Sequence, residues 1–217
     1  MRKALPTGGL YAITEDRPQT LSALVAQVEA ALRGGAVVVQ YRRKTQSPAT
    51  QRREAAALLA VCERHAGVFI VNDDVELALA VGAHGVHLGR EDESYLALAS
   101  NPTRTLLLGV SCYDSLGLAR LACAAGVDYL AFGSIFPSRS KPHAPACALA
   151  VLAQARLEFN VPIVAIGGIT PENAALVVAA GAHFIAAIGG VFAQDCVATS
   201  AARYARLFPP SRVVPHV

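Results

Sequence analysis

The chain has 217 residues, of which 53% are hydrophobic and 16% are charged, and its formal net charge at pH 7 is +3. This length suits one large α/β domain. The basic residues that cluster within 42–53 sit partly at a strand end and have no aromatics interleaved, which favours a small anionic ligand over a polyanion such as nucleic acid. Polar residues interrupt every apolar stretch before the ~20 residues of a membrane span, and the stretch behind the basic N-terminus is too short for a secretory signal. We expect a soluble cytoplasmic protein with no membrane or nucleic-acid partner.

Short β-branched apolar runs alternate along the chain with alanine- and leucine-rich segments of helical spacing. The predicted strands cover 9–14, 36–41, 68–71, 84–88, 106–110, 128–132, 162–166 and 183–188. The clearest predicted helices cover 20–33, 48–65, 74–81, 115–125, 146–158, 172–180 and 197–207. Continuous apolar runs suit strands buried on both faces, as in a parallel sheet covered by helices.

Eight such strands in about this length favour a single (β/α)8 TIM barrel over residues 1–208, followed by a C-terminal tail over 209–217. A doubly wound open sheet is the alternative. Glycine precedes four of the strands by one or two residues, where it suits the left-handed conformation that ends a helix. These glycines are Gly35, Gly82, Gly126 and Gly181.

The second predicted strand ends in polar and basic residues. Strand alternation sends Gln40, Arg42 and Lys44 to one side and Tyr41 and Arg43 to the other. If the first set faces the barrel mouth, an amide and two cations converge there, which suits a di- or triphosphorylated ligand. The alternative is an exposed strand end with solvated charges.

Carboxylates follow the next two strands. Asp73 and Asp74 come directly after Asn72, and Asp92 lies in the next strand-end loop. Carboxylates gathered at one end of a barrel repel one another unless a cation neutralises them, and Mg²⁺ takes one or two carboxylates plus substrate phosphates. The alternative is that these residues cap the helices that follow, and Asp74 is the better candidate for a cap.

Cysteines and histidines carry less information. The five cysteines are odd in number and form no CxxC pair, which argues against disulfides and a structural zinc site. Cys112, next to Ser111 at a strand end, is interpreted as a small apolar filler rather than a ligand contact. His84 and His183 flank strand starts and are interpreted as structural, whereas His87 lies within a strand that can direct it into the barrel.

Three segments late in the chain predict phosphate contacts, namely one loop and two glycine pairs. The loop over 133–142 contains Ser138, Ser140 and Lys141 behind an apolar anchor over 135–137, so it can fold over a ligand as a lid. The alternative is a flexible surface loop.

The glycine pairs 167–168 and 189–190 end the last two predicted strands. In barrels the loops after strands seven and eight often bind phosphate, because glycine lets backbone N–H groups approach an anion closely.

Six phrases of this sequence, in this order, resemble the thiamine-phosphate synthase (thiamine-phosphate pyrophosphorylase) family. They span about residues 9–193 and read GLYAITED, QYRRK, VNDDVELALAVGAHGVHLGREDE, GVSCYD, DYLAFGSIFPSRSK and VPIVAIGGITPENAALVVAAGA. The resemblance implies a (β/α)8 barrel and a transferase of thiamine biosynthesis. Its small-molecule substrates would be hydroxymethylpyrimidine diphosphate and hydroxyethylthiazole phosphate, its cofactor Mg²⁺, and its products thiamine monophosphate and pyrophosphate. The implied mechanism is dissociative and needs no protein nucleophile.

The resemblance also implies roles for the matched positions. The implied magnesium ligands are Asp73 and Asp92. The implied contacts to the pyrimidine diphosphate are Gln40, Arg42, Lys44, Asn72, Ser111 and Lys141. The implied contacts near the thiazole phosphate are Ser138, Ser140, Gly168, Ile188 and Gly189. The four residues implied to act in catalysis are Arg42, Lys44, Ser111 and Lys141.

Three other functions compete with this one. They are a related thiazole tautomerase, a sugar-phosphate epimerase-like barrel and a non-catalytic phosphate-binding barrel. Asp73, Asp92 and the QxRxK pattern favour the synthase, because an isomerase need not bind magnesium diphosphate. The sequence leaves open whether the chain is a monomer or a homo-oligomer.

Overall fold

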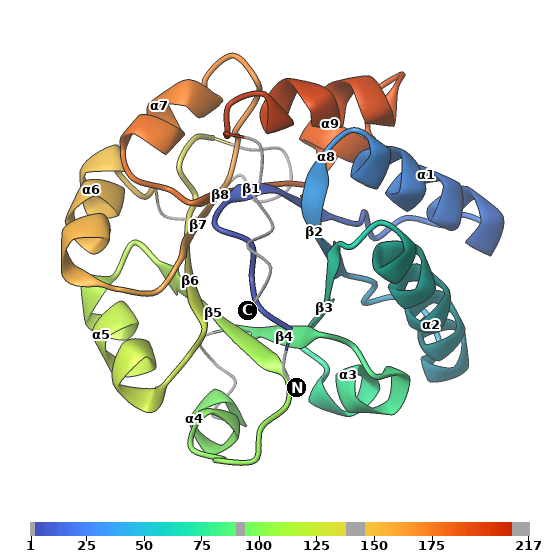
Figure 1. The fold of residues 1–217 in the computed structure, drawn as a ribbon, viewed down its shortest axis with the longest axis horizontal. Coiled ribbons are helices and arrows are strands. Elements are labelled where there is room, and N and C mark those ends of the chain that lie inside the picture. The colour runs from blue at the N-terminus through green and yellow to red at the C-terminus, as the bar shows by residue number, and fades with distance from the viewer. Residues whose placement is uncertain (1–2, 90–93, 138–145, 210–217) are drawn as a thin grey trace, which may run out of the picture.

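The strands form a closed parallel barrel in the order β1 to β8, with helices in a ring around it (Figure 1). This computed structural model describes residues 3–89, 94–137 and 146–209. The strands are β1 (Gly9–Ile13), β2 (Ala36–Tyr41), β3 (Val68–Asn72), β4 (Gly85–Leu88), β5 (Leu107–Tyr113), β6 (Tyr129–Phe132), β7 (Ile163–Ile166) and β8 (Phe184–Ala187). The (β/α)8 prediction is confirmed, and the open-sheet alternative is wrong because β1 pairs with both β2 and β8.

The helices alternate with the strands as predicted. They are α1 (Leu21–Arg33), α2 (Pro48–Arg64), α3 (Val75–Val81), α4 (Ser94–Ala99), α5 (Leu116–Ala125), α6 (Leu149–Glu158), α7 (Ala174–Ala179), α8 (Gly189–Phe192) and α9 (Val197–Ala205). The short helices α4 and α8 were not among the predicted elements. The predicted tail over 209–217 lies, apart from Pro209, outside the described residues.

Local hydrogen bonds explain where several helices begin. The side chains of Ser47, Asp74 and Ser115 each accept a backbone N–H from the first turn of α2, α3 and α5. Asp74 is therefore a cap, as its position predicts. The predicted helix over 172–180 begins two residues before α7 does. The reason is that the side chain of Asn173 accepts the Thr170 N–H instead of capping a helix.

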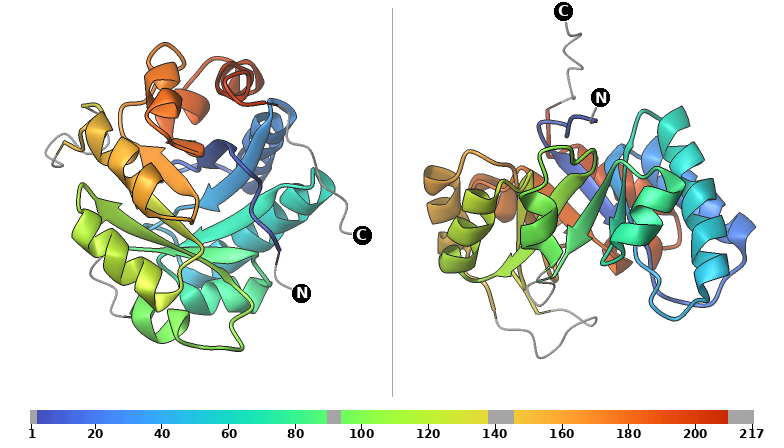
Figure 2. Two further views of the ribbon diagram at one scale, coloured as in Figure 1. Left: turned by 60° about the vertical axis from the view of Figure 1, so that its left-hand side comes forward. Right: turned by 90° about the horizontal axis from the view of Figure 1, so that it is seen from below.

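Two apolar layers hold the barrel together. An outer layer packs the helices against the strands, and an inner cluster fills the barrel, with Tyr11, Ile70, Tyr129 and Phe184 among its largest side chains. The side view in Figure 2 (right) shows the N-terminal segment at one end of the barrel, where Leu5 packs against the inner cluster. The carboxyl ends of the strands are left to form the site.

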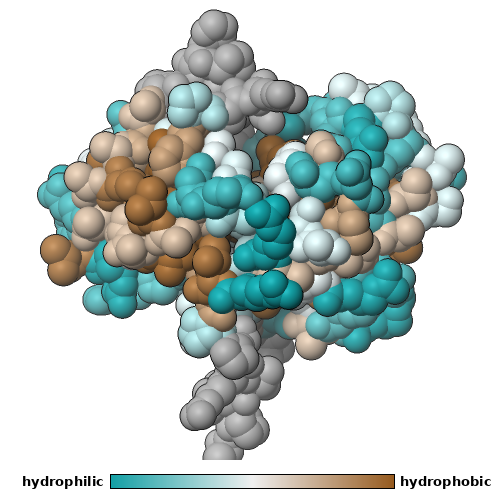
Figure 3. Space-filling view, turned by 90° about the horizontal axis from the view of Figure 1, so that it is seen from above, coloured by the Kyte–Doolittle hydropathy of each residue, from teal (hydrophilic) through white to brown (hydrophobic). Residues whose placement is uncertain are grey.

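The outer surface is mixed in character. Figure 3 shows the side formed by α7, α9 and α1, where apolar surface gathers over α7. Leu176 of α7 is one of the exposed large hydrophobic residues. In the part of the chain that the structure describes, no helix combines the length and the apolar character needed to cross a bilayer.

Candidate active site

A chain of hydrogen bonds crosses the barrel interior from β2 to β5. The Gln40 amide nitrogen donates to the Tyr11 hydroxyl at 2.8 Å, and that hydroxyl lies 2.9 Å from the Tyr129 hydroxyl. Tyr129 lies 3.1 Å from His87 Nδ1, and His87 Nε2 lies 2.9 Å from Ser111 Oγ. The chain thus joins two predicted substrate contacts, Gln40 and Ser111.

One direction of donation along this chain gives each of its hydrogen bonds a donor and an acceptor. Because the Tyr11 hydroxyl accepts from Gln40, its own hydrogen can point to Tyr129, and Tyr129 can then donate to Nδ1 of His87. In the tautomer that accepts this bond, His87 carries its hydrogen on Nε2 and can donate it to Ser111 Oγ. This arrangement leaves the Ser111 hydroxyl hydrogen available for a ligand.

Burial keeps the two tyrosines neutral. Desolvation raises the pKa of Tyr11, against the smaller lowering effect of its hydrogen bonds to Tyr129 and Gln40. Desolvation also raises the pKa of Tyr129, and the neighbouring Tyr11 adds to this effect. Both rings therefore act as hydrogen-bonding phenols and not as phenolates.

Glycine makes room for this arrangement. Gly109 in β5 pairs with Tyr129, and a Cβ at Gly109 would overlap the Tyr129 ring. The ring can therefore cross the barrel interior and stack on His87, with centroids 5.6 Å apart. The prediction that His87 can face the barrel is confirmed.

Lys44 and Asp73 meet at the carboxyl ends of β2 and β3. Lys44 Nζ lies 2.8 Å from Asp73 Oδ2, and both side chains are partly exposed. Asp73 has a φ of 63°, and its N–H donates to the His87 carbonyl. This left-handed residue turns the chain sharply between Asn72 and Asp74, so that Asp74 caps α3 while the Asp73 carboxylate faces the loop after β2.

The expected alternation along 40–44 is confirmed where contacts define it. Gln40 faces the barrel interior and Lys44 faces Asp73, whereas Tyr41 and Arg43 contact Glu54 of α2 outside the barrel. The Arg42 N–H donates to Thr14 Oγ1 at 2.9 Å, which ties this strand end to β1. Arg43 is buried, so it belongs to the structural core and not to a solvated basic cluster.

The late glycine segments lie beside the loop after β6. Gly168 has a φ of 59°, and a Cβ there would overlap the carbonyls of Phe136 and Pro137. Backbone hydrogen bonds join Ile135 to Ile166 and Phe136 to Gly167, which confirms the apolar anchor. Ile188 precedes α8, and Gly189 begins that helix. Their roles as phosphate contacts stay predictions.

Several predicted site residues lie outside the described residues. These are Asp92, Ser138, Ser140 and Lys141. Within the described residues there is no group of three or more histidine, cysteine or acidic side chains that could hold a metal ion. Of the predicted magnesium ligands, the structure therefore places only Asp73.

The sequence reasoning missed Tyr11 and Tyr129 as site residues. Both lie in apolar strand phrases, where they look like ordinary core aromatics, and their hydroxyls meet across 118 positions of the chain. No local pattern reveals so distant a contact. Cys112, by contrast, is buried in the outer layer, and desolvation raises the pKa of its thiol to about 12, so its reading as a filler is supported.

Fold and site together define a (β/α)8-barrel protein whose polar groups gather at the carboxyl ends of the strands. The sequence profile of the family described as thiamine monophosphate synthase matches residues 10–191. The chain belongs to this family.

Individual relatives agree with this assignment. The chain is 47% identical over 200 residues to a thiamine-phosphate synthase from Thioalkalivibrio sulfidiphilus, which covers 92% of the chain and 95% of that relative. It is 50% identical over 203 residues to one from Aromatoleum aromaticum, with 92% and 96% covered. Among solved structures, it resembles the thiamine phosphate pyrophosphorylase from Pyrococcus furiosus with a TM-score of 0.83 and 33% identity, over 93% of this chain and 96% of that one.

Proposed function

We propose that this chain couples hydroxymethylpyrimidine diphosphate with hydroxyethylthiazole phosphate to give thiamine monophosphate and pyrophosphate. The carbon–oxygen bond between the pyrimidinyl methylene and the diphosphate breaks, and the bonding electrons leave with the diphosphate. The thiazole nitrogen then forms a bond to the same carbon. No protein nucleophile takes part.

The observation that carries this proposal is the placement of two polar systems at one end of the barrel. The chain from Gln40 to Ser111 offers directed hydrogen bonds inside the barrel, which suit an aminopyrimidine ring. Lys44 and Asp73 lie on neighbouring strand ends above it, where a diphosphate attached to that ring would lie. Family membership supplies the identity of the two substrates.

Charge separation in the reaction explains why these side chains would matter. The departing diphosphate gains negative charge, and Lys44 with Arg42 would stabilise it most in the transition state. The pyrimidinylmethyl fragment becomes a cation, which electron donation from its amino group stabilises. Gln40 would orient that amino group, while Asn72 and Ser111 would bind the oxygen atoms that carry the departing charge.

Magnesium fits the donor chemistry of this end of the barrel. Asp73 presents a carboxylate that already attracts the Lys44 ammonium at 2.8 Å. We assign Asp73 and Asp92 as the residues that would hold the ion. Bound there, Mg²⁺ would neutralise diphosphate oxygens as the leaving group departs. Lys141, with the hydroxyls of Ser138 and Ser140, would complete the phosphate contacts, together with Gly168, Ile188 and Gly189.

A two-substrate assay tests the proposal. Protein, Mg²⁺ and both substrates should release pyrophosphate and form thiamine monophosphate, and leaving out either substrate should abolish the coupled product. Isomerisation of the thiazole without pyrophosphate release would instead indicate a tautomerase. Binding of both compounds without turnover would indicate a non-catalytic phosphate-binding protein.

A further inference from the structure

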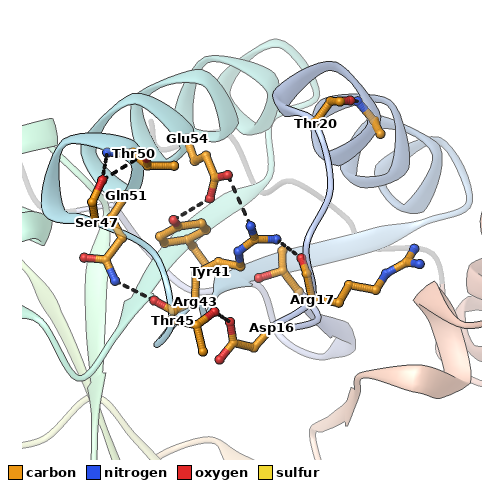
Figure 4. Close-up of polar contacts among 12 residues, drawn as sticks. Asp16, Arg17, Thr20, Tyr41, Arg43, Thr45, Ser47, Thr50, Gln51 and Glu54 are labelled. Atoms are coloured by element: carbon orange, nitrogen blue, oxygen red, sulfur yellow. Dashed lines mark hydrogen bonds and ion pairs between the residues drawn. The ribbon is translucent and has the colours of Figure 1, made fainter.

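A buried ion pair joins the loop after β2 to helix α2, and its arginine also contacts the loop after β1. Arg43 lies 3.4 Å from Glu54 of α2, and the two side chains are only 1% and 3% exposed. The other terminal nitrogen of Arg43 donates to the backbone carbonyl of Arg17, at 2.6 Å. Figure 4 shows this guanidinium between α2 and the loop after β1.

Tyr41 completes the cluster from the strand itself. Its hydroxyl donates to Glu54 at 2.7 Å, so the carboxylate is held from both Tyr41 and Arg43. Burial raises the pKa of Tyr41, and the neighbouring carboxylate raises it further, so the phenol keeps its proton. Glu54 therefore has a fixed position, and the Arg43 guanidinium is fixed with it.

Asp16 forms a second link between the loop after β1 and the loop after β2. Its carboxylate accepts the Lys44 backbone N–H at 3.1 Å and the Thr45 hydroxyl at 2.9 Å. Although desolvation opposes the change, the hydrogen bonds from Thr45 and Lys44 lower the pKa of Asp16. Gln51 of α2 also donates to the Arg43 carbonyl. The backbone on both sides of Arg43 is thus tied to neighbouring elements.

The burial of this ion pair is not explained by stability alone. Removing two charges from water costs several kcal/mol, which the attraction between them offsets only with good geometry. Among the described residues, Arg43 Nε is one of the buried polar atoms that lack a hydrogen-bond partner. The pair instead fixes the position of the backbone around Arg43. Arg43 lies between Arg42 and Lys44, and strand alternation directs those two away from Arg43.

We propose that Arg43, Glu54 and Asp16 are positioning residues that hold Arg42 and Lys44 in place for the diphosphate. The inference rests on the proposed function, in which Arg42 and Lys44 contact that group. Arg43 itself faces α2, so it acts through its neighbours and not on the substrate.

Glu54→Gln tests the inference because it keeps the shape of the side chain and an acceptor for Tyr41 while removing the charge. We expect the dissociation constant for inorganic pyrophosphate with Mg²⁺, measured by calorimetry, to rise by about tenfold. The KM for the pyrimidine diphosphate should rise with it, and the KM for the thiazole phosphate should stay within about twofold.

The matched control is Asp128→Asn at the opposite end of the barrel. Asp128 lies directly before β6 and forms a largely buried ion pair with Arg104. This change therefore also converts the carboxylate of such a pair into an amide. It should lower stability without changing pyrophosphate affinity. A loss of pyrophosphate affinity in this control as large as that in Glu54→Gln would overturn the inference.

The double variant R43M/E54Q separates positioning from stability. Removing the unpaired Arg43 charge should restore much of the stability that Glu54→Gln loses. Pyrophosphate affinity should stay low, because the donor to the Arg17 carbonyl is also gone. Recovery of affinity together with stability would show a merely structural role. If the wild-type protein neither binds pyrophosphate nor turns over, the proposed function fails instead.

Discussion

At the scale of single residues, one hydroxyl connects the two halves of the interior hydrogen-bond chain. Tyr129 contacts Tyr11 on one side and His87 on the other. Its ring is buried beside Gly109, where added side-chain volume would displace it. The Tyr129 hydroxyl therefore helps to hold His87 and Gln40 in the orientations that the proposed pyrimidine contact requires.

Tyr129→Phe should weaken both stability and turnover. The change removes the hydrogen bonds that Tyr129 makes with Tyr11 and His87, so the free energy of unfolding should fall by about 1–3 kcal/mol. The kcat/KM for the pyrimidine diphosphate should fall, while the KM for the thiazole phosphate should change little. Urea denaturation and steady-state kinetics measure these effects. Unchanged kcat/KM in a destabilised variant would remove the interior chain from the mechanism.

Lys44→Met should tighten the binding of Mg²⁺ to the protein without substrate. Lys44 Nζ lies 2.8 Å from Asp73. Under the proposed ligand assignment, this ammonium would compete with Mg²⁺ for the same carboxylate. Calorimetry with Mg²⁺ should show several-fold tighter binding, whereas turnover should fall because the diphosphate loses a cation.

Lys3→Met is the control for that experiment. It makes the same change of charge at a lysine that donates to the Gly67 carbonyl, just before the start of β3 and so at the end of the barrel opposite the site. Its Mg²⁺ affinity should match that of the wild-type protein. If Lys44→Met binds Mg²⁺ no more tightly than this control, Asp73 is not a ligand for the ion in the free protein.

At the scale of elements, two histidines join neighbouring strands at the end of the barrel opposite the site. His84 Nδ1 accepts the Phe69 N–H of β3, and His183 Nδ1 accepts the Ile163 N–H of β7. Burial lowers the pKa of both side chains, and nearby Lys3 and Arg156 add to the effect. The fold therefore favours the neutral imidazole at both positions, as their structural interpretation requires.

The stability of the protein should therefore fall in mild acid. Above the unfolded pKa of 6.5, both histidines are neutral whether the chain is folded or not. Below pH 6.5 the two histidines bind protons more readily in the unfolded chain than in the folded chain. The free energy of unfolding therefore decreases as pH falls toward the lowered pKa values of the folded chain. Urea denaturation between about pH 5 and pH 8 measures this slope. His84→Asn, which keeps an acceptor, should make it shallower, and an unchanged slope would contradict the assignment.

Most of the elements could be predicted from the sequence because their signals are local. Apolar runs, caps such as Ser47 and Asp74, and glycines with positive φ such as Gly82 and Gly126 mark the strands and helix ends. Helix α8 has only four residues, too few to show a helical period. Helix α4 was missed although it is as long as α7. Strand β5 continues past its predicted end, because the polar Ser111 points inward to His87 and still pairs with β6.

The site was predictable only in part, because only some of its contacts have a local signal in the sequence. Alternation alone separates Gln40 from Tyr41 and Arg43, and the contacts confirm it. The two tyrosines of the interior chain come from β1 and β6, and only closure of the barrel brings their hydroxyls together. The Arg43–Glu54 pair joins a strand end to a helix, which no spacing rule identifies.

At the scale of the whole molecule, parallel topology divides the barrel into two ends. Every strand runs in the same direction, so all carboxyl ends, with Lys44 and Asp73, lie at one end. The start of β8 lies at the other end, where Phe184 is 1% exposed and pairs with Gly9 and Val164. Loss of core volume there should affect folding without changing the geometry of the site.

Phe184→Leu and Gln40→Leu test this division as a pair. The first leaves a cavity in the inner cluster and should lower the free energy of unfolding by roughly 1–3 kcal/mol, less than truncation to alanine would. Its kcat/KM should stay close to the wild-type value at temperatures where it is folded. The second removes the amide that begins the interior chain, so it should lower kcat/KM far more than stability. Equal losses of activity in the two folded variants would show that the two ends of the barrel are coupled. A cavity at the start of β8 can affect Gln40 only if the strands between them move.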